Sequence, residues 1–562
     1  MIGFTSADLL GLLPALLLVL AGMAVLLLEV FQRASFPRTH LAYVTALAAL
    51  LAAGVSYLIA PAEPQTLWGG MVRFDALGCV ITAFTAVACA ITALGSTRYL
   101  EQLEIDRGEY YALLLFATAG MSVMVSANDF IVLFLGLEMG AVAMYALTAY
   151  QRRSNLSSEA GFKYFLLGAL GSALLVYGVA FLTGLTGSTG YDQIGAALRA
   201  PDAARHFANP TGVVPFLPLP LVGMALVFVA FLIKMAAAPF HMWAPDAYSG
   251  APTPTTGFLS GAGKIAGVAA LFRLFAGPFA TPELSGGVAG WTTIAFFAAL
   301  ASIVVGNLVA LTQKRVRRML AWSSVAHAGY LLLALCALGV QEAAAGSIRA
   351  VILYGAAYSV ATAGAFVVLG AFGRDQAEVD TLDELSGLGR KHPAMGLALS
   401  LFLISAAGLP PAAGFVAKLS LFSTAFAAGE GSAIPASFAE MLQWLAVGGL
   451  VLSVAGGLAY LRVIAHLYGR DAHVRVDYRP HTATTLAVGL AAFLTLWMGL
   501  LPGRVLVWGD NVAKQLLTAP AVAAAPSEPA PAAPADAGPS APPSEALKAI
   551  EVVPLPNAEL PR

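Results

Sequence analysis

The sequence predicts an all-α, polytopic membrane protein with about fourteen transmembrane helices. Of its 562 residues, 59% are hydrophobic and only 11% are charged, whereas an ordinary soluble domain has about 25% charged residues. A water-soluble fold of this length could not bury so much apolar surface, but a lipid bilayer can accept it. The apolar residues also fall into runs of about twenty, the length that an α-helix needs to cross the hydrocarbon core.

The apolar runs place each span in order. The first run begins at Leu9 without a basic segment before it, so it is predicted to be the first helix and not a signal peptide. The fourth and fifth spans are separated only by Asn128–Asp129, and the mixed stretch 191–209 is expected to be an interfacial helix or a loop. The expected spans are 9–30, 41–60, 74–95, 111–127, 129–149, 162–184, 219–242, 255–277, 291–311, 319–340, 348–372, 394–427, 440–467 and 483–507.

The distribution of lysine and arginine predicts the orientation. The loops that follow odd-numbered spans carry about four times as many of these residues as the others, and cytoplasmic loops are the ones that collect positive charge. Both termini are therefore expected on the non-cytoplasmic side. The Ala/Pro-rich segment 519–562 cannot bury a core, so it is predicted to be a disordered tail on the outer face.

Composition and motifs exclude several other classes of protein. The formal net charge is −1, so nucleic acid is not expected as a partner. Cys79, Cys89 and Cys336 lie in apolar stretches without paired spacing, so neither a disulfide framework nor an iron–sulfur site is expected. The glycine-rich patterns that hold dinucleotides or phosphates are missing as well. We therefore expect no cofactor and no metal in this chain.

Ionisable residues inside the expected spans require an explanation, because each costs about 2.5–3.5 kcal/mol at the bilayer centre. Glu138, Lys234, Lys264, His327 and Lys418 all lie well inside a span. Lys234 and Lys264 lie roughly 12–14 Å from the nearer helix end, too deep for the side chain to reach water. A lysine held between desolvation and a nearby carboxylate can take up and release a proton. The pattern predicts a proton relay, with static ion pairs between helices as the alternative.

Lys163 and two residues of a loop have simpler explanations. Lys163 is one residue inside its span, so its ammonium can reach the interface, and Glu159 four residues earlier suits an ion pair on one helix face. His241 and Asp246 lie between the seventh and eighth spans. They are expected in an anchored turn at the interface.

Two spans are predicted to be discontinuous. Pro239 follows Lys234 by five residues, and Pro410–Pro411 precedes Lys418. Broken helices at matching places indicate two inverted five-helix repeats, here spans four to eight and nine to thirteen; the alternative is that the prolines only bend helices for packing. The expected parts are a three-helix segment at 1–110, repeats at 111–277 and 291–468, a last helix at 483–507 and the tail at 519–562.

Four runs of sequence resemble the antiporter-like subunits of proton-pumping NADH–quinone oxidoreductase, respiratory complex I. The resemblance covers about residues 1–510, and Lys418 favours the subunit N branch because the related M subunits usually have glutamate there. The runs are AAPFHMWAPDAYSGAPTPTTGFLSGAGKIAGVAALFRL, RVRRMLAWSSVAHAGYLL, LPPAAGFVAKLSLF and FLGLEMGAVAMYAL.

The resemblance implies a function and a set of site residues. The family fold has fourteen helices with two inverted repeats, and its members move protons while other subunits pass electrons from NADH to quinone. FMN, iron–sulfur clusters and quinone are then expected in partner subunits, within a bacterial inner membrane. The alternatives are a subunit of a multi-subunit cation/proton antiporter and a structural membrane scaffold. The residues that match the family's proton-transfer positions are Glu138, Lys163, Lys234, Lys264, His327 and Lys418.

Overall fold

Long apolar helices make up most of the computed structural model, which describes residues 6–32, 37–200, 218–286, 290–374, 377–430, 436–469 and 481–518. Twelve helices within these residues are long and apolar enough to cross a membrane by length and composition. They are α1 (Ser6–Phe31), α2 (Thr39–Leu58), α3 (Ala76–Gln102), α4 (Gly108–Val125), α5 (Phe130–Thr148), α6 (Asn155–Thr186), the run Thr253–Ala276, α14 (Trp291–Thr312), α15 (Val316–Leu338), α16 (Gln341–Ala371), α21 (Ala436–Gly469) and α22 (Thr482–Leu500). The prediction of an all-α polytopic fold is confirmed.

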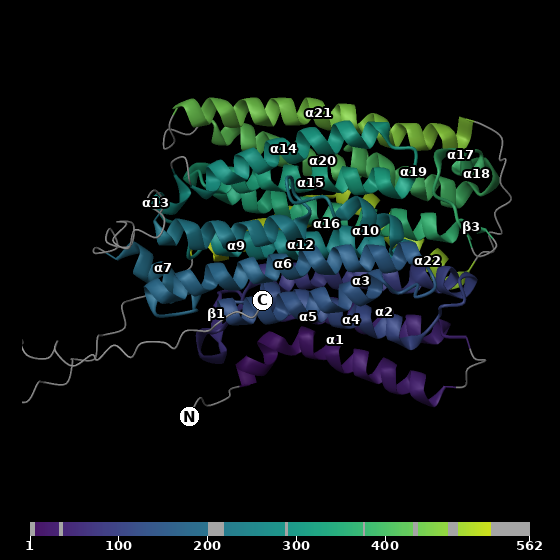
Figure 1. Ribbon diagram of the computed structural model, residues 1–562, viewed down its shortest axis with the longest axis horizontal. Coiled ribbons are helices and arrows are strands. Elements are labelled where there is room, and N and C mark those ends of the chain that lie inside the picture. The colour runs from purple at the N-terminus through teal and green to yellow at the C-terminus, as the bar shows by residue number, and fades with distance from the viewer. Residues whose placement is uncertain are drawn as a thin grey trace, which may run out of the picture. The chain divides into compact units, whose positions relative to one another are not determined.

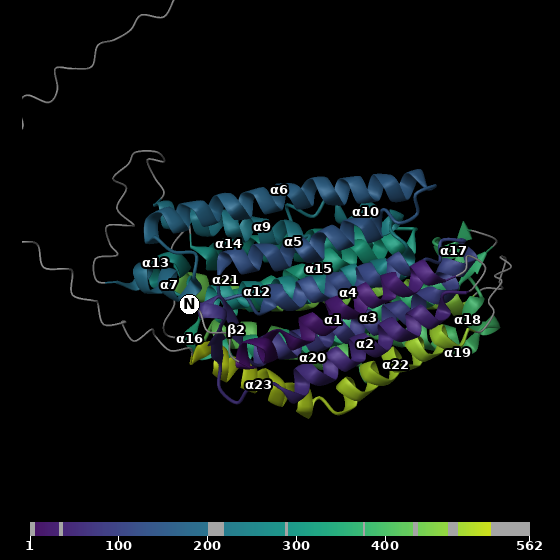
Figure 2. The same cartoon turned by 90° about the horizontal axis from the view of Figure 1, so that it is seen from below.

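The long helices run side by side (Figures 1 and 2). The buried helix α16 packs against the preceding helix α15 and against α3 and α22, which come from distant parts of the chain. The first helix, α1, exposes large apolar side chains such as Leu20 and Leu27, as a lipid-facing helix does. Helices α4 and α5 approach closely at Gly120, because glycine has no side chain there. A Cβ on Gly120 would lie only 2.3 Å from the backbone nitrogen of Gly140.

Both expected helix breaks are present. Helix α9 (Leu219–Met235) ends at Ala236, which has a φ of 55°, and the chain becomes helical again at α10 (Ala244–Gly250). Helix α19 (Pro393–Ala407) ends at Gly408, which has a φ of 82°, before α20 (Ala413–Ala428) begins. The peptide bonds before Pro239 and Pro411 are cis. Each break leaves backbone groups without their helical partners.

Two expected spans have a different form. The eighth span is interrupted: α11 (Thr253–Phe258) leads into a π-helical turn, η2 (Leu259–Gly263), before α12 (Lys264–Ala276). The last span was expected to reach residue 507, which is wrong, because α22 ends at Leu500 and a separate helix, α23 (Gly503–Leu517), follows. Pro502 lies between the two helices and has no N–H to continue the first.

Short elements cover the ends of the long helices. The stretch 191–209 was expected to be an interfacial helix or a loop, and it begins as a helix. Residues 201–209 and the tail 519–562 lie outside the described residues. The two hairpins are antiparallel, and the first pairs Gln65 with Phe74. The elements are β1 (Gln65–Leu67), η1 (Trp68–Gly70), β2 (Val72–Phe74), α7 (Tyr191–Arg199), α13 (Pro282–Ser285), β3 (Gly373–Arg374), β4 (Ala377–Glu378), α17 (Leu382–Leu385) and α18 (Leu388–Lys391).

A buried ion cluster fixes the start of α3. The Asp75 carboxylate accepts hydrogen bonds from the Gly78 amide at 2.9 Å and from both terminal nitrogens of Arg273 at 2.6 and 2.8 Å. Arg73 lies 3.4 Å from the same carboxylate. Burial alone would raise the pKa of Asp75, but the adjacent Arg273 guanidinium and the Gly78 amide hold that pKa below its usual range. Helix α23 completes this end, because Gln515 accepts from the Ala76 amide at 2.7 Å.

Candidate functional site

The first candidate pair, Glu138 and Lys234, joins α5 to the end of α9. The Lys234 ammonium lies 3.7 Å from Oε1 of Glu138 and donates to the Tyr145 hydroxyl at 3.1 Å. Ser172 of α6 donates to the same carboxylate oxygen of Glu138. Because α9 ends one residue after Lys234, the lysine stands at the break and not in a continuous helix. A shift of this helix end would change the distance between the two charged groups.

Lys163 lies in a second, more exposed cluster. Its ammonium is 2.6 Å from Glu159, which confirms the expected pair on one helix face, and 2.7 Å from Asp246. Arg318 contacts the other oxygen of Asp246 at 2.8 Å. Asp246 is therefore more than part of a turn, because it joins α6 and α15 to the segment after the helix break. The Lys163 side chain is 39% exposed, so it lies apart from the buried lysines.

Lys264 is buried and follows the π-helical turn directly. Its ammonium donates to the Ser324 carbonyl and, at 2.6 Å, to the Ser324 hydroxyl. Ser324 belongs to α15, the helix that also carries His327. The π turn leaves a backbone irregularity at the position of this lysine, and such turns occur frequently at functional sites.

His327 is held by two tyrosines. Its Nδ1 lies 2.5 Å from the Tyr354 hydroxyl on α16, and its Nε2 lies 3.0 Å from the Tyr460 hydroxyl on α21. The ring is 3% exposed. Since a neutral imidazole has one donor and one acceptor nitrogen, one tyrosine donates to His327 and the other accepts from it. The pair of contacts suits a proton that enters on one nitrogen and leaves from the other.

Lys418 stands beside the second helix break. Its ammonium donates to the Ala407 carbonyl at 3.1 Å and to the Ser453 hydroxyl at 2.8 Å. Ala407 is the last residue of α19, so the break frees this carbonyl to accept the lysine. The ammonium also lies 5.3 Å from the centre of the Tyr330 ring, where a cation interacts favourably with an aromatic face.

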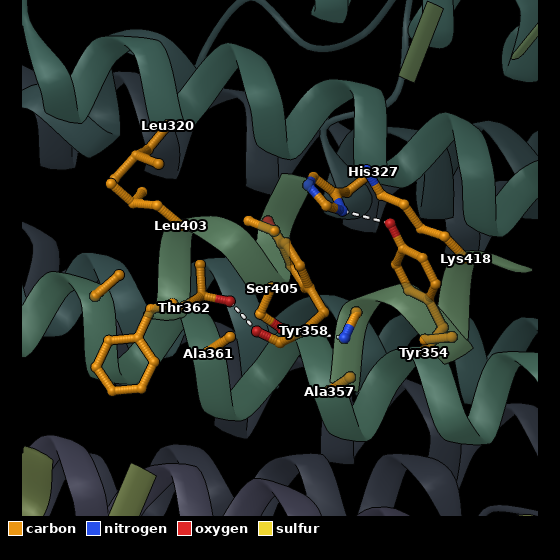
Figure 3. A pocket seen from close by; sticks show the side chains of 15 residues that line it. Leu320, His327, Tyr354, Ala357, Tyr358, Ala361, Thr362, Leu403, Ser405 and Lys418 are labelled. Atoms are coloured by element: carbon orange, nitrogen blue, oxygen red, sulfur yellow. Dashed lines mark hydrogen bonds between the residues drawn. The ribbon is translucent and has the colours of Figure 1, made fainter. Parts of the chain in front are cut away.

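A small cavity of about 30 Å³ is lined by both His327 and Lys418. Tyr354 and Tyr358 line it as well (Figure 3). One water needs about 10–15 Å³ of such space, so the cavity has room for about two water molecules. The wall of this cavity is mostly apolar, although the residues that line it include His327, Tyr358 and Lys418.

Five of the six candidate residues lie in two groups, and Lys163 lies apart from both. Glu138 contacts Lys234; His327 and Lys418 share the cavity, and Lys264 contacts the helix of His327. The sequence reasoning missed the hydroxyl partners, whose one signal was the recurrence of serine and tyrosine inside apolar spans. These partners are Tyr145, Ser172, Ser324, Tyr354, Ser453 and Tyr460.

Comparisons with known proteins agree on one family. Residues 127–442 match the family model described as "NADH:quinone oxidoreductase/Mrp antiporter, TM". NADH-quinone oxidoreductase subunit N 1 of Sorangium cellulosum is 40% identical, over 82% of this chain and 88% of its own length. Subunit N of Trichlorobacter lovleyi is 35% identical over 91% and 98%. A chain of respiratory complex I from Thermus thermophilus with bound Aureothin superposes with a TM-score of 0.68 at 31% identity, covering 88% of this chain and 98% of that one.

Proposed function

We propose that the buried ionisable residues of this chain form the route by which it moves protons. The premise is that the chain belongs to the NADH-quinone oxidoreductase subunit N family, whose members are proton-translocating membrane subunits. Family membership favours this function over that of an antiporter subunit or a scaffold. Other complex I subunits are the partners of the chain. The proposed proton-transfer residues are Glu138, Lys163, Lys234, Lys264, His327 and Lys418.

One observation carries this proposal: each deep lysine stands at an irregularity of its helix. Lys234 is in the last turn before a break, Lys264 follows a π turn, and Lys418 bonds the carbonyl freed by a second break. Irregular backbone at membrane depth is tolerated where it lines a polar pathway. Packing alone would not require a buried charge at every one of these places.

The helix order supports two inverted repeats. Each broken helix counts as one span, which brings the twelve long helices to fourteen. The repeats would then run from α4 to α12 and from α14 to α21, each with one broken helix. We propose lipid on the exposed apolar faces and FMN, iron–sulfur clusters and quinone in partner subunits. A proton that crosses 100 mV costs about 2.3 kcal/mol, so the driving energy has to come from those partners.

Replacing Lys418 with glutamine is expected to lower proton translocation by at least about tenfold, because an amide is polar and can donate hydrogen bonds but cannot take up and release a proton. The measurement is NADH-driven proton uptake by inverted membrane vesicles, normalised to assembled complex. Lys514→Gln is the control, since Lys514 lies exposed on α23. Equal proton uptake in the two variants would contradict the proposed route.

We also expect both termini on the non-cytoplasmic side, because the arginine-rich loops follow odd-numbered spans. A reporter that is active only in the cytoplasm, fused after Leu517, should stay silent. The same reporter inserted after Gln313, in the basic loop between α14 and α15, should be active. A signal from the first fusion would overturn the assigned orientation.

A further inference from the structure

The hydrogen bonds of Lys264 lead away from its ammonium in two directions. The Ser324 hydroxyl, which accepts from Lys264 at 2.6 Å, lies 3.1 Å from the Tyr248 hydroxyl. It also accepts from the Ser260 hydroxyl at 3.2 Å. Ser324 is therefore a branch point, whose own hydrogen can turn toward either neighbour. Tyr248 lies on α10, the segment that follows the first helix break.

The Ser260 branch continues to a tyrosine of the central helix. Ser260 lies in the π turn four residues before Lys264, and its hydroxyl is 2.9 Å from the hydroxyl of Tyr358 on α16. Either of these two oxygens can be the donor. Three hydroxyls thus form an unbroken line from Lys264 to Tyr358, with no carboxylate in it.

Tyr358 connects this line with the cavity. Its side chain lines the cavity together with His327 and Lys418 (Figure 3). The Tyr358 ring packs on the His327 ring with 4.4 Å between centres. Lys418 lines the same cavity, so the last step of the route would cross this mostly apolar space, which has room for about two water molecules.

We infer that Ser260 and Tyr358 are proton-transfer residues that pass the proton from Lys264, through Ser324, to the cavity beside Lys418. This inference rests on the proposed function and adds residues to its route. Hydroxyl chains of this kind transfer protons because each oxygen accepts on one side as it donates on the other.

The transfer balances without any charged hydroxyl. The Lys264 ammonium gives a proton to the Ser324 oxygen, whose own proton passes to Ser260. The Ser260 proton passes to the Tyr358 oxygen, and the Tyr358 proton passes through cavity water to the neutral amine of Lys418. Lys264 ends neutral and Lys418 ends charged, while each hydroxyl has lost one proton and gained one. After the transfer each hydroxyl hydrogen points back toward Lys264. The structure has this orientation at Ser260, which donates to Ser324. The hydroxyl groups must rotate before the next transfer.

The branch at Ser324 gives this route a switch. While the Ser324 hydrogen points to Tyr248, the line to Ser260 is interrupted; when it points to Ser260, the line is complete. Because Tyr248 belongs to α10, a movement of that segment changes which neighbour Ser324 serves. The broken helix with Lys234 and the transfer from Lys264 are in this way connected through one hydroxyl.

Removing single hydroxyls tests the inference in the assembled complex. Tyr358→Phe and Ser260→Ala are each expected to lower NADH-driven proton uptake by at least about tenfold. The ratio of rates in H₂O and D₂O should rise in both, because proton transfer then limits turnover. The double variant should be no slower than the slower single variant, since both changes interrupt one route.

Matched controls remove buried hydroxyls elsewhere. Tyr110→Phe deletes a fully buried phenol that bonds Ser96 and Thr255. Ser359→Ala deletes a hydroxyl whose one hydrogen bond among the described residues is to the Gly355 carbonyl of its own helix. Both are expected to translocate protons like the parent chain.

The outcomes separate this inference from the proposed function. If Ser260→Ala and Tyr358→Phe match their controls while Lys418→Gln fails, the route does not use these hydroxyls and the proposed function stands. If Lys418→Gln also matches its control, the proposed function itself is wrong. Should Tyr358→Phe fail to assemble, Ser260→Ala decides, because it removes one small oxygen from a well-packed turn.

Discussion

Replacing Lys234 with arginine is expected to stop proton translocation through this chain while the protein still assembles. Lys234 lies 3.7 Å from the Glu138 carboxylate. Arginine keeps a positive charge at this place, so an ion pair with Glu138 can still form. A guanidinium stays charged at any accessible pH, however, and cannot release a proton. A static ion pair would accept the exchange, whereas a relay would not. The measurement is NADH-driven proton uptake in vesicles, per assembled complex.

The companion variant Lys234→Ala separates charge from proton transfer. It removes the positive charge beside Glu138 and leaves Ser172 as the hydrogen-bond partner of that carboxylate among the described residues, so translocation should again be lost. Lys514→Arg, on the exposed face of α23, is the control for the arginine exchange. Proton uptake by Lys234→Arg at the level of the parent chain would make the Glu138–Lys234 contact a structural ion pair.

Replacing Asp75 with alanine is expected to have the largest effect on stability. Removing one partner of a buried ion pair costs about 3–5 kcal/mol, because the other charge is left unpaired. Here two buried guanidinium groups, Arg73 and Arg273, would lose their shared carboxylate. Asp510→Ala is the matched control, since Asp510 pairs with Arg349 on the surface, where an ion pair contributes about 0–1 kcal/mol. Thermal unfolding in detergent and the amount of assembled complex measure the difference.

The pH dependence of the Asp75 contribution has a definite sign. The folded-state pKa of Asp75 lies below its ordinary value of 3.8, so its stabilising contribution is present above that value. The contribution is lost as the pH falls through the lower, folded-state pKa. The parent chain should therefore lose stability in strong acid more steeply than Asp75→Ala. A parallel loss in both would show that Asp75 is not the carboxylate responsible.

The helices and their breaks could be predicted because each leaves a local mark in the sequence. A run of twenty apolar residues indicates a span, and Pro239 and Pro410–Pro411 marked both breaks. The deep lysines were equally visible, since a charge in an apolar run is costly and therefore rare. These features depend on neighbours within a few residues, which is the range that sequence patterns cover.

The partners of these residues could not be predicted, because they depend on contacts between distant segments. Asp75 and Arg273 are 198 positions apart, and Ser324 lies 60 positions from Lys264. Asp246 was expected in a simple turn, although Lys163 and Arg318 both bind it. The π turn before Lys264 has no local signal either, since its residues Leu259–Gly263 read as ordinary helix. Tertiary packing decides such details.

Lys234 faces a carboxylate, but the ion pairs among the residues that the structure describes include neither Lys264 nor Lys418. Within the described part of the chain, carbonyls, hydroxyls and one aromatic ring face surround the ammonium of each of these lysines. In a medium of low dielectric constant, two such charges repel one another over a longer range than in water. Protonation of one lysine therefore disfavours protonation of the other, and release of a proton from one favours its uptake by the other. Ions in neighbouring sites of a channel repel one another in the same way. If protons follow the proposed route, they would therefore pass through this half of the chain one at a time.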